Sequence, residues 1–357
     1  MLVCPADGLT LGSISGGCLE ADVVDQANAV LVTGEPLILT YDTTSESDIL
    51  WGFGLGCNGV VKVLIERLEP GDPFAPLNFV ADCVRRRASG VLARVIHVEK
   101  FPAVPLGASL MLRDGQPVVH NMAHEPLARL VAQDASEVLR DQCSKHRNYP
   151  LAEGACGVFL ELIRPPLPLL IFGAGHDAVP LTRFARELGW HVTVVDHRPA
   201  FATAERFPKA DVVIVARPSD VSEDLIDDKT ATVVMTHHYL HDLALLRMLF
   251  RSPARYIGLV GPRQRRERLL ADLRRDGSDL SVDQLQRLHA PVGLDLGAES
   301  PEEVALAIAA EVKAVLGCRS GGLLRERAGA IHDQASATAF ATESSVTPHR
   351  LRSAADG

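Results

Sequence analysis

The sequence predicts an α/β protein in which an N-terminal α+β domain is followed by a Rossmann-like domain with a doubly wound parallel sheet. Its 357 residues suffice for about two domains with separate cores. The segment RPPLP at 164–168 divides the chain, because prolines interrupt both helices and central strands. After this segment, apolar strands and helical stretches alternate regularly, which is typical of a parallel sheet covered by helices.

We therefore expect one domain at 1–163, a linker at 164–168 and the Rossmann-like domain at 169–322. The remaining extension, 323–357, is rich in Ala, Ser and Thr. Because such a composition buries little apolar surface, we expect this extension to be largely disordered from about residue 336.

The first domain mixes short strands with a few helices, which indicates an α+β domain around a partly antiparallel sheet. Strands are expected at 37–41, 60–68, 91–98, 109–113, 117–120 and 158–163. Helices are expected at 19–32, 77–87 and 125–143.

In the Rossmann-like domain, strands are expected at 169–172, 191–195, 212–216, 232–236 and 256–260. A closing helix is marked at both ends. Ser300 is the expected N-cap, Pro301 the first helical residue and Glu303 the second half of a capping box, and Gly317 follows the last turn.

The composition is that of a soluble globular protein, with 47% hydrophobic and 23% charged residues. A net charge of −9 gives no general attraction to nucleic acid or to an anionic membrane. The sequence shows no secretory signal and no apolar run of bilayer length. Seven cysteines without a C-x-x-C pair argue against a disulfide framework or a structural zinc site. We therefore expect a cytoplasmic protein with reduced thiols.

Two glycine-rich turns each contain a cysteine. GSISGGCLE at 12–20 places Cys18 near the first turn of the expected helix. Free N–H groups and the helix dipole at this position favour anions and lower the pKa of a thiol, whereas the charges of Glu20 and Asp22 raise it. GFGLGCNG at 52–59 places Cys57 in a second such turn. By itself, Cys18 is equally well interpreted as a reactive thiol or as a small buried residue, and the second turn favours the reactive thiol.

A dinucleotide-binding fingerprint opens the Rossmann-like domain, in LLIFGAGHDAVPL at 169–181. Gly173 allows the tight turn, Gly175 admits a pyrophosphate to the helix N-terminus, and Ala178 allows helix and strand to pack closely. Asp196 ends the next strand about 20 residues later, where an acid bonds a ribose hydroxyl and repels a 2′-phosphate. The motif thus favours NAD over NADP. The alternative is a Rossmann scaffold that binds no nucleotide.

A histidine-rich motif, THHYLHD at 236–242, follows the fourth strand of this domain. Its spacing matches no standard zinc pattern, so we expect no metal site. We expect His237 to contact a ligand at the carboxyl edge of the sheet and the other histidines to be solvated. The arginine-rich run at 263–275 is interpreted as a solvated helix face, because acids are interspersed in it.

Taken together, these motifs resemble the XdhC and CoxI family of accessory proteins for molybdenum hydroxylases such as xanthine dehydrogenase. The resemblance rests on GSISGGCLE (12–20), GLGCNG (54–59), FGAGH (172–176), VVDHRP (194–199), MTHHYLHD (235–242), YIGLVGPR (256–263) and APVGLDLGAESPEEVALAI (290–308). It extends from Met1 to about His332. Family members normally have a strand-bearing stretch before the position of Met1, so we expect either a start assigned too late or a truncated first domain.

The resemblance implies a carrier rather than a turnover enzyme. Such a protein binds the molybdenum cofactor, as molybdopterin or its dinucleotide form, supports its sulfuration and inserts it into the apo-enzyme of a hydroxylase. A cysteine desulfurase and a second copy of the chain are further expected partners. The alternative is an NAD-dependent oxidoreductase that uses the Rossmann-like domain, and a third hypothesis is an adaptor that binds the hydroxylase without cofactor.

The resemblance and the residue chemistry together give a set of candidate site residues. Ser15, Gly16 and Gly17 would hold a polar or anionic part of the cofactor, and Cys18 or Cys57 would lie near the molybdenum or the exchanged sulfur. The Rossmann-like domain would bind the nucleotide part of a dinucleotide cofactor, NAD or another nucleotide. Its candidate binding residues are Gly173, Gly175, His176, Asp196 and His237.

Overall fold

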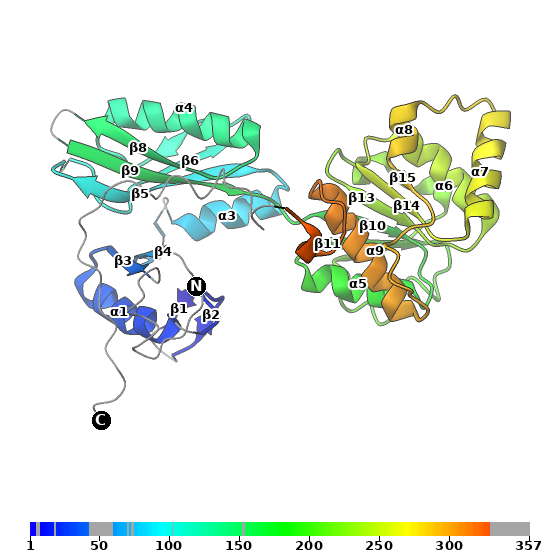
Figure 1. Cartoon of the computed structure of the whole chain (residues 1–357), viewed down its shortest axis with the longest axis horizontal. Coiled ribbons are helices and arrows are strands. Elements are labelled where there is room, and N and C mark those ends of the chain that lie inside the picture. Colours follow the sequence, from blue (N-terminus) through cyan, green and yellow to red (C-terminus); the bar gives the residue numbers. More distant parts are fainter. Residues whose placement is uncertain are drawn as a thin grey trace. The chain divides into compact units, whose positions relative to one another are not determined.

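A computed structural model of the chain describes residues 1–4, 8–17, 19–42, 60–69, 71–72, 75–101, 103–151 and 154–328. The chain forms two compact units that divide between Pro165 and Pro166. Both units combine helices and strands, so the predicted α/β fold class is confirmed (Figure 1). In the described part of the chain, no helix is both long enough and apolar enough to cross a membrane.

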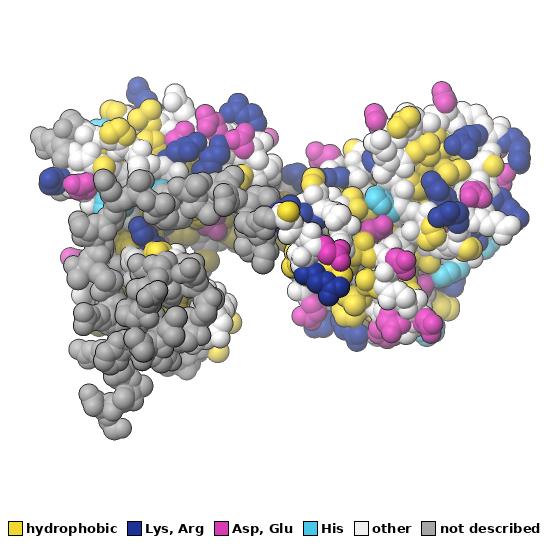
Figure 2. Space-filling view, viewed as in Figure 1, with side chains coloured by type: hydrophobic (Ala, Val, Ile, Leu, Met, Phe, Trp, Pro, Cys, Tyr) yellow, Lys and Arg dark blue, Asp and Glu magenta, His cyan; other side chains and the backbone are white. Residues whose placement is uncertain are grey.

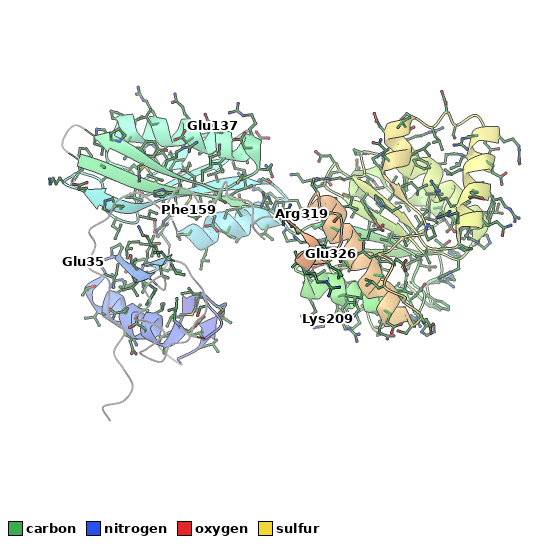
Figure 3. All side chains as sticks on the ribbon, viewed as in Figure 1. Glu35, Glu137, Phe159, Lys209, Arg319 and Glu326 are labelled. Carbon is green, nitrogen blue, oxygen red and sulfur yellow. The ribbon has the colours of Figure 1, made fainter. Side chains whose placement is uncertain are left out.

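The first unit begins with a small helix-and-hairpin lobe. Helix α1 (Glu20–Thr33) packs against β3 (Leu37–Asp42) and β4 (Val60–Ile65), which pair in antiparallel fashion. Its buried residues, Val23, Ala27 and Val30, recur at helical spacing, so one face of α1 covers the hairpin. The short strands β1 (Leu2–Val3) and β2 (Thr10–Leu11) pair beside this lobe's glycine turn. Glu35, labelled in Figure 3, lies in the link between α1 and β3.

The first unit also contains a five-stranded sheet in the order β7-β6-β5-β9-β8, with every pairing antiparallel. The strands are β5 (Gly90–Glu99), β6 (Ser109–Arg113), β7 (Val119–His120), β8 (Lys145–Leu151) and β9 (Gly154–Ile163). Helix α4 (Glu125–Asp141) covers one face and α3 (Pro76–Arg85) packs against the other (Figure 1).

Alternation along β5 explains this two-sided packing. Val91, Ala93 and Val95 belong to the core under α4, whereas Leu92 belongs to the cluster with Cys83 of α3. Gly90 has no side chain because a Cβ there would lie 2.6 Å from the ring of Phe79.

The second unit is a six-stranded parallel sheet in the order β12-β11-β10-β13-β14-β15. The strands are β10 (Pro168–Phe172), β11 (His191–Asp196), β12 (Val212–Val215), β13 (Ala231–Val234), β14 (Tyr256–Leu259) and β15 (Leu288–His289). Strands β11 and β12 follow β10 on one side of the sheet. Strands β13, β14 and β15 then follow on the other side of β10. The strand order thus reverses between β10 and β13, which is where Rossmann folds bind ligands.

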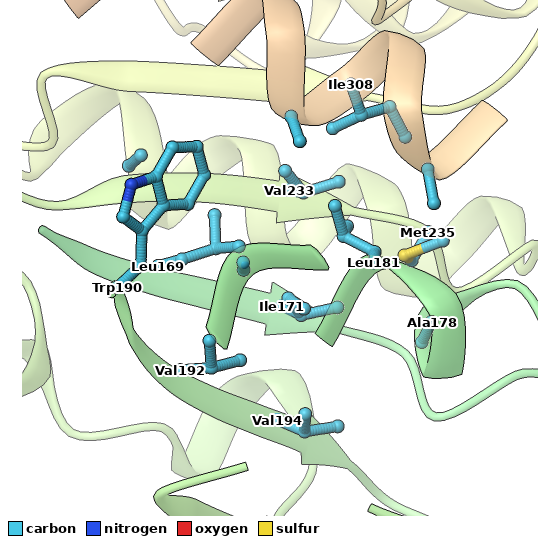
Figure 4. Close-up of a cluster of buried hydrophobic side chains, with 14 of the residues drawn as sticks. Leu169, Ile171, Ala178, Leu181, Trp190, Val192, Val194, Val233, Met235 and Ile308 are labelled. Carbon is cyan, nitrogen blue, oxygen red and sulfur yellow. The ribbon is translucent and has the colours of Figure 1, made fainter. Parts of the chain in front are cut away.

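Helices cover both faces of this sheet. They are α5 (Ala178–Glu187), α6 (Tyr239–Arg251), α7 (Arg263–Arg275), α8 (Val282–Gln286) and α9 (Pro301–Leu316), with single 3-10 turns at Pro218–Asp220, Glu223–Leu225 and Leu324–Glu326. Figure 4 shows Ile308 of α9 and Leu181 of α5 packed over Ile171 and Val233 of the sheet. A second core joins the opposite face to α6 and α7.

Helix α9 begins with the predicted capping box. Ser300 accepts a hydrogen bond from the N–H of Glu303, and the Glu303 side chain accepts one from the N–H of Ser300. The surface around these helices is mixed in charge, with basic and acidic side chains interspersed on the face shown in Figure 2.

Candidate functional site

The glycine turn before α1 is ordered by a carboxylate from the helix itself. Oε1 of Glu20 accepts hydrogen bonds from the N–H groups of Ile14 (3.0 Å) and Ser15 (2.7 Å) and from the Ser13 hydroxyl (2.8 Å). Oε2 accepts from the Ser15 hydroxyl at 2.7 Å. These bonds, those from Ser15 foremost, hold the pKa of Glu20 far below its ordinary value. The chain thus supplies its own anion to part of this turn.

Two backbone N–H groups of the turn have no acceptor among the described residues. Gly16 and Gly17 are exposed, and no described residue accepts a hydrogen bond from either N–H group. Nothing described lies within 4 Å of a Cβ built on either glycine. Gly17 has φ of 109°, which a side-chain-bearing residue adopts only with strain. The turn therefore offers open space and two N–H groups directly before residue 18.

Neither candidate cysteine belongs to the described residues, and the turn at 52–59 lies outside them as well. Ser15 is described, and its Oγ also accepts a hydrogen bond from the N–H of Leu19 at 3.1 Å. No disulfide joins the five described cysteines to one another: Cys4, Cys83, Cys143, Cys156 and Cys318.

In the second unit, the first glycine of the fingerprint passes close to the neighbouring strand. Gly173 has φ of 119°, and a Cβ there would lie 2.4 Å from the carbonyl oxygen of Met235. Only glycine fits this position. The turn leads from β10 into α5 over the end of β13, so it borders the crevice where the strand order reverses.

The second glycine makes room for an acidic side chain. A Cβ on Gly175 would lie 2.5 Å from Oδ1 of Asp177, the residue that precedes α5. The other oxygen, Oδ2, lies 2.7 Å from Nε2 of His237. A carboxylate of the chain itself therefore lies beside the glycine where a pyrophosphate was expected, and that negative charge opposes an anion at this point.

His237 lies directly at this crevice, where the chain leaves β13. Its backbone has φ of 57°, an uncommon conformation for a residue with a side chain. The side chain is 60% exposed and contacts Asp177. His176, which is exposed, lies in the glycine turn of the fingerprint itself. The structure thus brings His237 to the fingerprint turn, as a neighbour of Asp177.

Asp196 is buried and already bonded within the protein. Its carboxylate accepts from the N–H of Ala174 (2.7 Å), from the N–H of Arg198 (2.8 Å), and from two guanidinium nitrogens of Arg198 (2.7 and 3.0 Å). Burial alone would raise the pKa of Asp196, but the bonds from Arg198 and Ala174 lower it to about 2. The carboxylate therefore anchors the glycine turn to the end of β11, and Arg198 neutralises it.

A narrow pocket opens beside this carboxylate at the carboxyl edge of the sheet. It is lined by Phe172, Gly173, Val195, Asp196, His197, Ala216, Pro218, Val221, Thr236, His241 and Leu245. Its volume of about 20 Å³ has room for a single water molecule. A nucleotide would therefore lie across the mouth of this pocket rather than inside it.

Three imidazole rings gather at the mouth. The His241 ring lies 4.5 Å from that of His197 and 4.2 Å from that of His238, measured between centroids. Burial and then the two neighbouring rings lower the pKa of His241, so the neutral form is favoured. Within the described ranges, no group of three or more His, Cys, Asp or Glu side chains is arranged to hold a metal ion.

The acid of the histidine motif has a structural role. Asp242 is 1% exposed, and its Oδ2 accepts hydrogen bonds from Arg265 at 2.6 and 3.1 Å. Its Oδ1 accepts from the Thr236 hydroxyl at 2.5 Å. Arg265 is therefore part of a buried ion pair, whereas the sequence placed it on a solvated face.

Three charged residues around this crevice were not predicted as site residues from the sequence: Asp177, Arg198 and Arg206. Asp177 lies inside the fingerprint, and Arg198 follows Asp196 by two residues. The sequence therefore shows a charged residue beside each predicted ligand contact, and this signal could have identified both. Arg206 lies in an irregular segment, and only the three-dimensional structure brings it to Ala174.

Comparisons with known proteins match the chain on both units. A family model described as the XdhC Rossmann domain matches residues 169–312, and one described as the XdhC and CoxI family matches residues 1–42. The chain is 33% identical over 306 residues to a protein of Bacillus subtilis (strain 168) that is named as a probable subunit of xanthine dehydrogenase. That match covers 85% of the chain and 84% of the relative. The chain is also 31% identical over 173 residues to "Uncharacterized protein YqeB" of Escherichia coli (strain K12), which is 48% of the chain and 31% of that protein.

One solved structure is similar over most of the chain. It is the crystal structure of a protein described as a xanthine dehydrogenase from Bacillus halodurans, with a TM-score of 0.69 and 30% sequence identity. The match covers 88% of this chain and 85% of that one. The similarity therefore includes both units and not the Rossmann unit alone.

Proposed function

Because the chain belongs to the XdhC and CoxI family, we propose that it is an accessory protein for a molybdenum hydroxylase of the xanthine dehydrogenase type. In this proposal it binds the molybdenum cofactor, supports its sulfuration and inserts it into the apo-enzyme. The names of the Bacillus relatives refer to xanthine dehydrogenase, and the chain spans most of their length, which supports this client.

One structural observation carries the cofactor part of the proposal. The open N–H groups of Gly16 and Gly17 lie directly before Cys18, in a turn with no described side chain above it. A pterin cofactor has polar and phosphate oxygens that accept such bonds, and its sulfur-ligated molybdenum suits a soft thiolate. When bound, the cofactor supplies the metal and sulfur chemistry. The chain's residues hold its polar part and bring Cys18 or Cys57 to it.

Cofactor retention tests this role. We expect Cys18→Ala and Cys57→Ala each to reduce the molybdenum and pterin that remain with the protein after gel filtration, and the double variant to retain least. Cys318→Ala is the matched control, because Cys318 is an exposed thiol of the second unit. Undiminished retention in the double variant would contradict the proposal.

We further propose a carrier that works with partners rather than a turnover enzyme. A hydroxylase apo-enzyme would receive the cofactor, a cysteine desulfurase would supply the sulfur, and a second copy of the chain would form a homodimer. Co-purification of the tagged chain with each candidate, before and after cofactor loading, tests these contacts separately. An adaptor without a cofactor role would capture apo-enzyme but retain no molybdenum.

A second candidate function, an NAD-dependent oxidoreductase, is favoured by one contact. His237 and Asp177 form a histidine–carboxylate pair at the edge where a Rossmann fold binds its nucleotide, and such a pair is able to transfer a proton. The absorbance of NADH in the presence of carbonyl substrates distinguishes the two functions. A protein that leaves NADH unchanged with a broad substrate panel is not this enzyme.

A further inference from the structure

We propose that the Rossmann unit binds a nucleotide that carries a phosphate group on its ribose ring, with Arg206 and Arg198 as the phosphate-binding residues. The site lies at the end of β11, the second strand of the unit. This inference concerns the second unit only and does not depend on binding of the molybdenum cofactor.

The guanidinium of Arg206 is the first feature that indicates an anion-binding site. Its Nε atom is buried and has no hydrogen-bond partner among the described residues, and its guanidinium lies 4.9 Å from the centre of the Phe201 ring. One terminal nitrogen reaches the carbonyl oxygen of Ala174 at 3.5 Å. The neighbouring acid, Glu205, bonds to its own backbone and to Thr203 instead. A buried guanidinium N–H without a partner is costly, and an oxyanion bonded to the terminal nitrogens of Arg206 would offset part of that cost.

Arg198 supplies a second cation at the same aromatic ring. Its guanidinium lies 4.0 Å from the centre of Phe201 and is bonded to Asp196 through Nε and one terminal nitrogen. The other terminal nitrogen is not used in this pairing. Asp196 is paired with Arg198, so it does not balance the positive charge of Arg206 at the same ring.

This charge reverses the expectation drawn from the sequence. A free carboxylate at the end of the second strand bonds ribose hydroxyls and repels a 2′-phosphate, whereas an arginine at this place accommodates one. In the structure Asp196 is 6% exposed and neutralised by Arg198. The group presented to a ribose is therefore a guanidinium.

The glycine turn connects this corner to the fingerprint. Ala174 donates its N–H to Asp196, and its carbonyl oxygen accepts a hydrogen bond from Arg206. Both charged groups therefore contact the glycine turn, which would lie beneath the nucleotide. Asp177 beside Gly175 opposes a pyrophosphate further along the turn. The ribose phosphate, rather than a pyrophosphate, is therefore the anion that this unit is built to hold.

Calorimetric titration of the full chain tests the proposal with defined probes: adenosine 2′,5′-bisphosphate, adenosine 3′,5′-bisphosphate, 5′-AMP and inorganic phosphate. We expect at least one bisphosphate to bind about tenfold more tightly than 5′-AMP, as one charge-assisted contact would provide. Comparing the two bisphosphates identifies the ribose position. Inorganic phosphate should bind more weakly than the preferred bisphosphate, because it lacks the nucleoside.

Variants assign the effect to the arginines. Arg206→Gln should reduce the preference for the bisphosphate to within about twofold of 5′-AMP, and Arg206→Lys should restore part of it. Arg183→Gln is the matched control, since Arg183 also lies over a phenylalanine ring, that of Phe184, but is exposed on α5. Thermal melting shows that each variant is folded. Equal affinities for bisphosphate and 5′-AMP, no binding of any probe, or an unchanged preference in Arg206→Gln would each overturn the proposal.

Discussion

Nε2 of His237 lies 2.7 Å from Oδ2 of Asp177, a contact between residues 60 positions apart in the sequence. It joins the residue that leaves β13 to the residue that precedes α5, at the point where the strand order of the sheet reverses. The contact places a histidine and a carboxylate over the glycine turn, where a Cβ on Gly175 would meet the Asp177 side chain.

The left-handed backbone of His237 predicts an unusual order of stabilities. Because φ is 57°, the alanine variant retains the backbone strain whereas the glycine variant relieves it. Both variants lose the same exposed contact with Asp177, which is worth less than about 1 kcal/mol. We expect His237→Gly to be more stable than His237→Ala by about 1 kcal/mol in urea denaturation. An alanine variant as stable as the glycine variant would show that the backbone there is not strained.

Asp196 predicts a pH-dependent contribution to stability. Its pKa falls from 3.8 to about 2 on folding, so its charged form stabilises the native state at pH values above 3.8, and this contribution is lost as pH falls through 2. We expect Asp196→Asn to lower the free energy of unfolding by about 2 kcal/mol at pH 7. The difference between the native chain and the variant should shrink to roughly half near pH 3. Urea titrations at both pH values measure it, and a difference independent of pH would contradict the role of the charge.

The buried pair of Asp242 and Arg265 predicts a large loss of stability when the acid is removed. Asp242→Ala leaves a partly buried guanidinium and the Thr236 hydroxyl without their acceptor, and we expect a cost of about 3 kcal/mol. The exposed pair of Arg247 and Asp276 is the control, and Asp276→Ala should cost less than about 1 kcal/mol. Chemical denaturation of the two variants under the same conditions gives the comparison. Similar losses would mean that burial of Asp242 contributes nothing.

The bonds of Glu20 predict slow exchange of two amides in the glycine turn. Since the N–H groups of Ile14 and Ser15 are bonded to its carboxylate, we expect them to exchange about tenfold faster in Glu20→Ala than in the native chain. Glu20→Gln should be intermediate, because its amide oxygen still accepts. Amide hydrogen exchange at pH values above and below 4.5 measures the effect. The low pKa of Glu20 means that protection should persist below its ordinary pKa of 4.5, and loss of protection just below that pH would contradict it.

Local patterns were sufficient to predict most of the fold. The capping box of Ser300 and Glu303 depends on residues three apart, so the sequence displays it directly. Strand β6 was predicted with the bounds that the structure has, Ser109–Arg113, because it is a short apolar run between turns. Strand β8 (Lys145–Leu151) was missed, because it is an edge strand of mostly polar residues, and β15 is only two residues long.

The site was harder to predict, because its contacts join residues that are distant in sequence. Spacing identified Asp196 and the glycines, but not that Asp196 would be bonded to Arg198 or that Asp177 would lie beside Gly175. These outcomes depend on the direction in which a side chain points once the strands are paired. A charge next to a motif is visible in the sequence, whereas its partner is set by the three-dimensional fold.

The carboxylate of Glu20 would also compete with any oxyanion for the turn at Ser13–Gly17. An oxyanion that reaches the N–H groups of Ile14 and Ser15 has to displace Glu20, and Glu20 takes those donors back when the oxyanion departs. The apparent affinity for the oxyanion is its intrinsic affinity multiplied by the fraction of time that the donors are free of the carboxylate. Such a built-in competitor favours reversible exchange over permanent capture, because the emptied state is already stabilised.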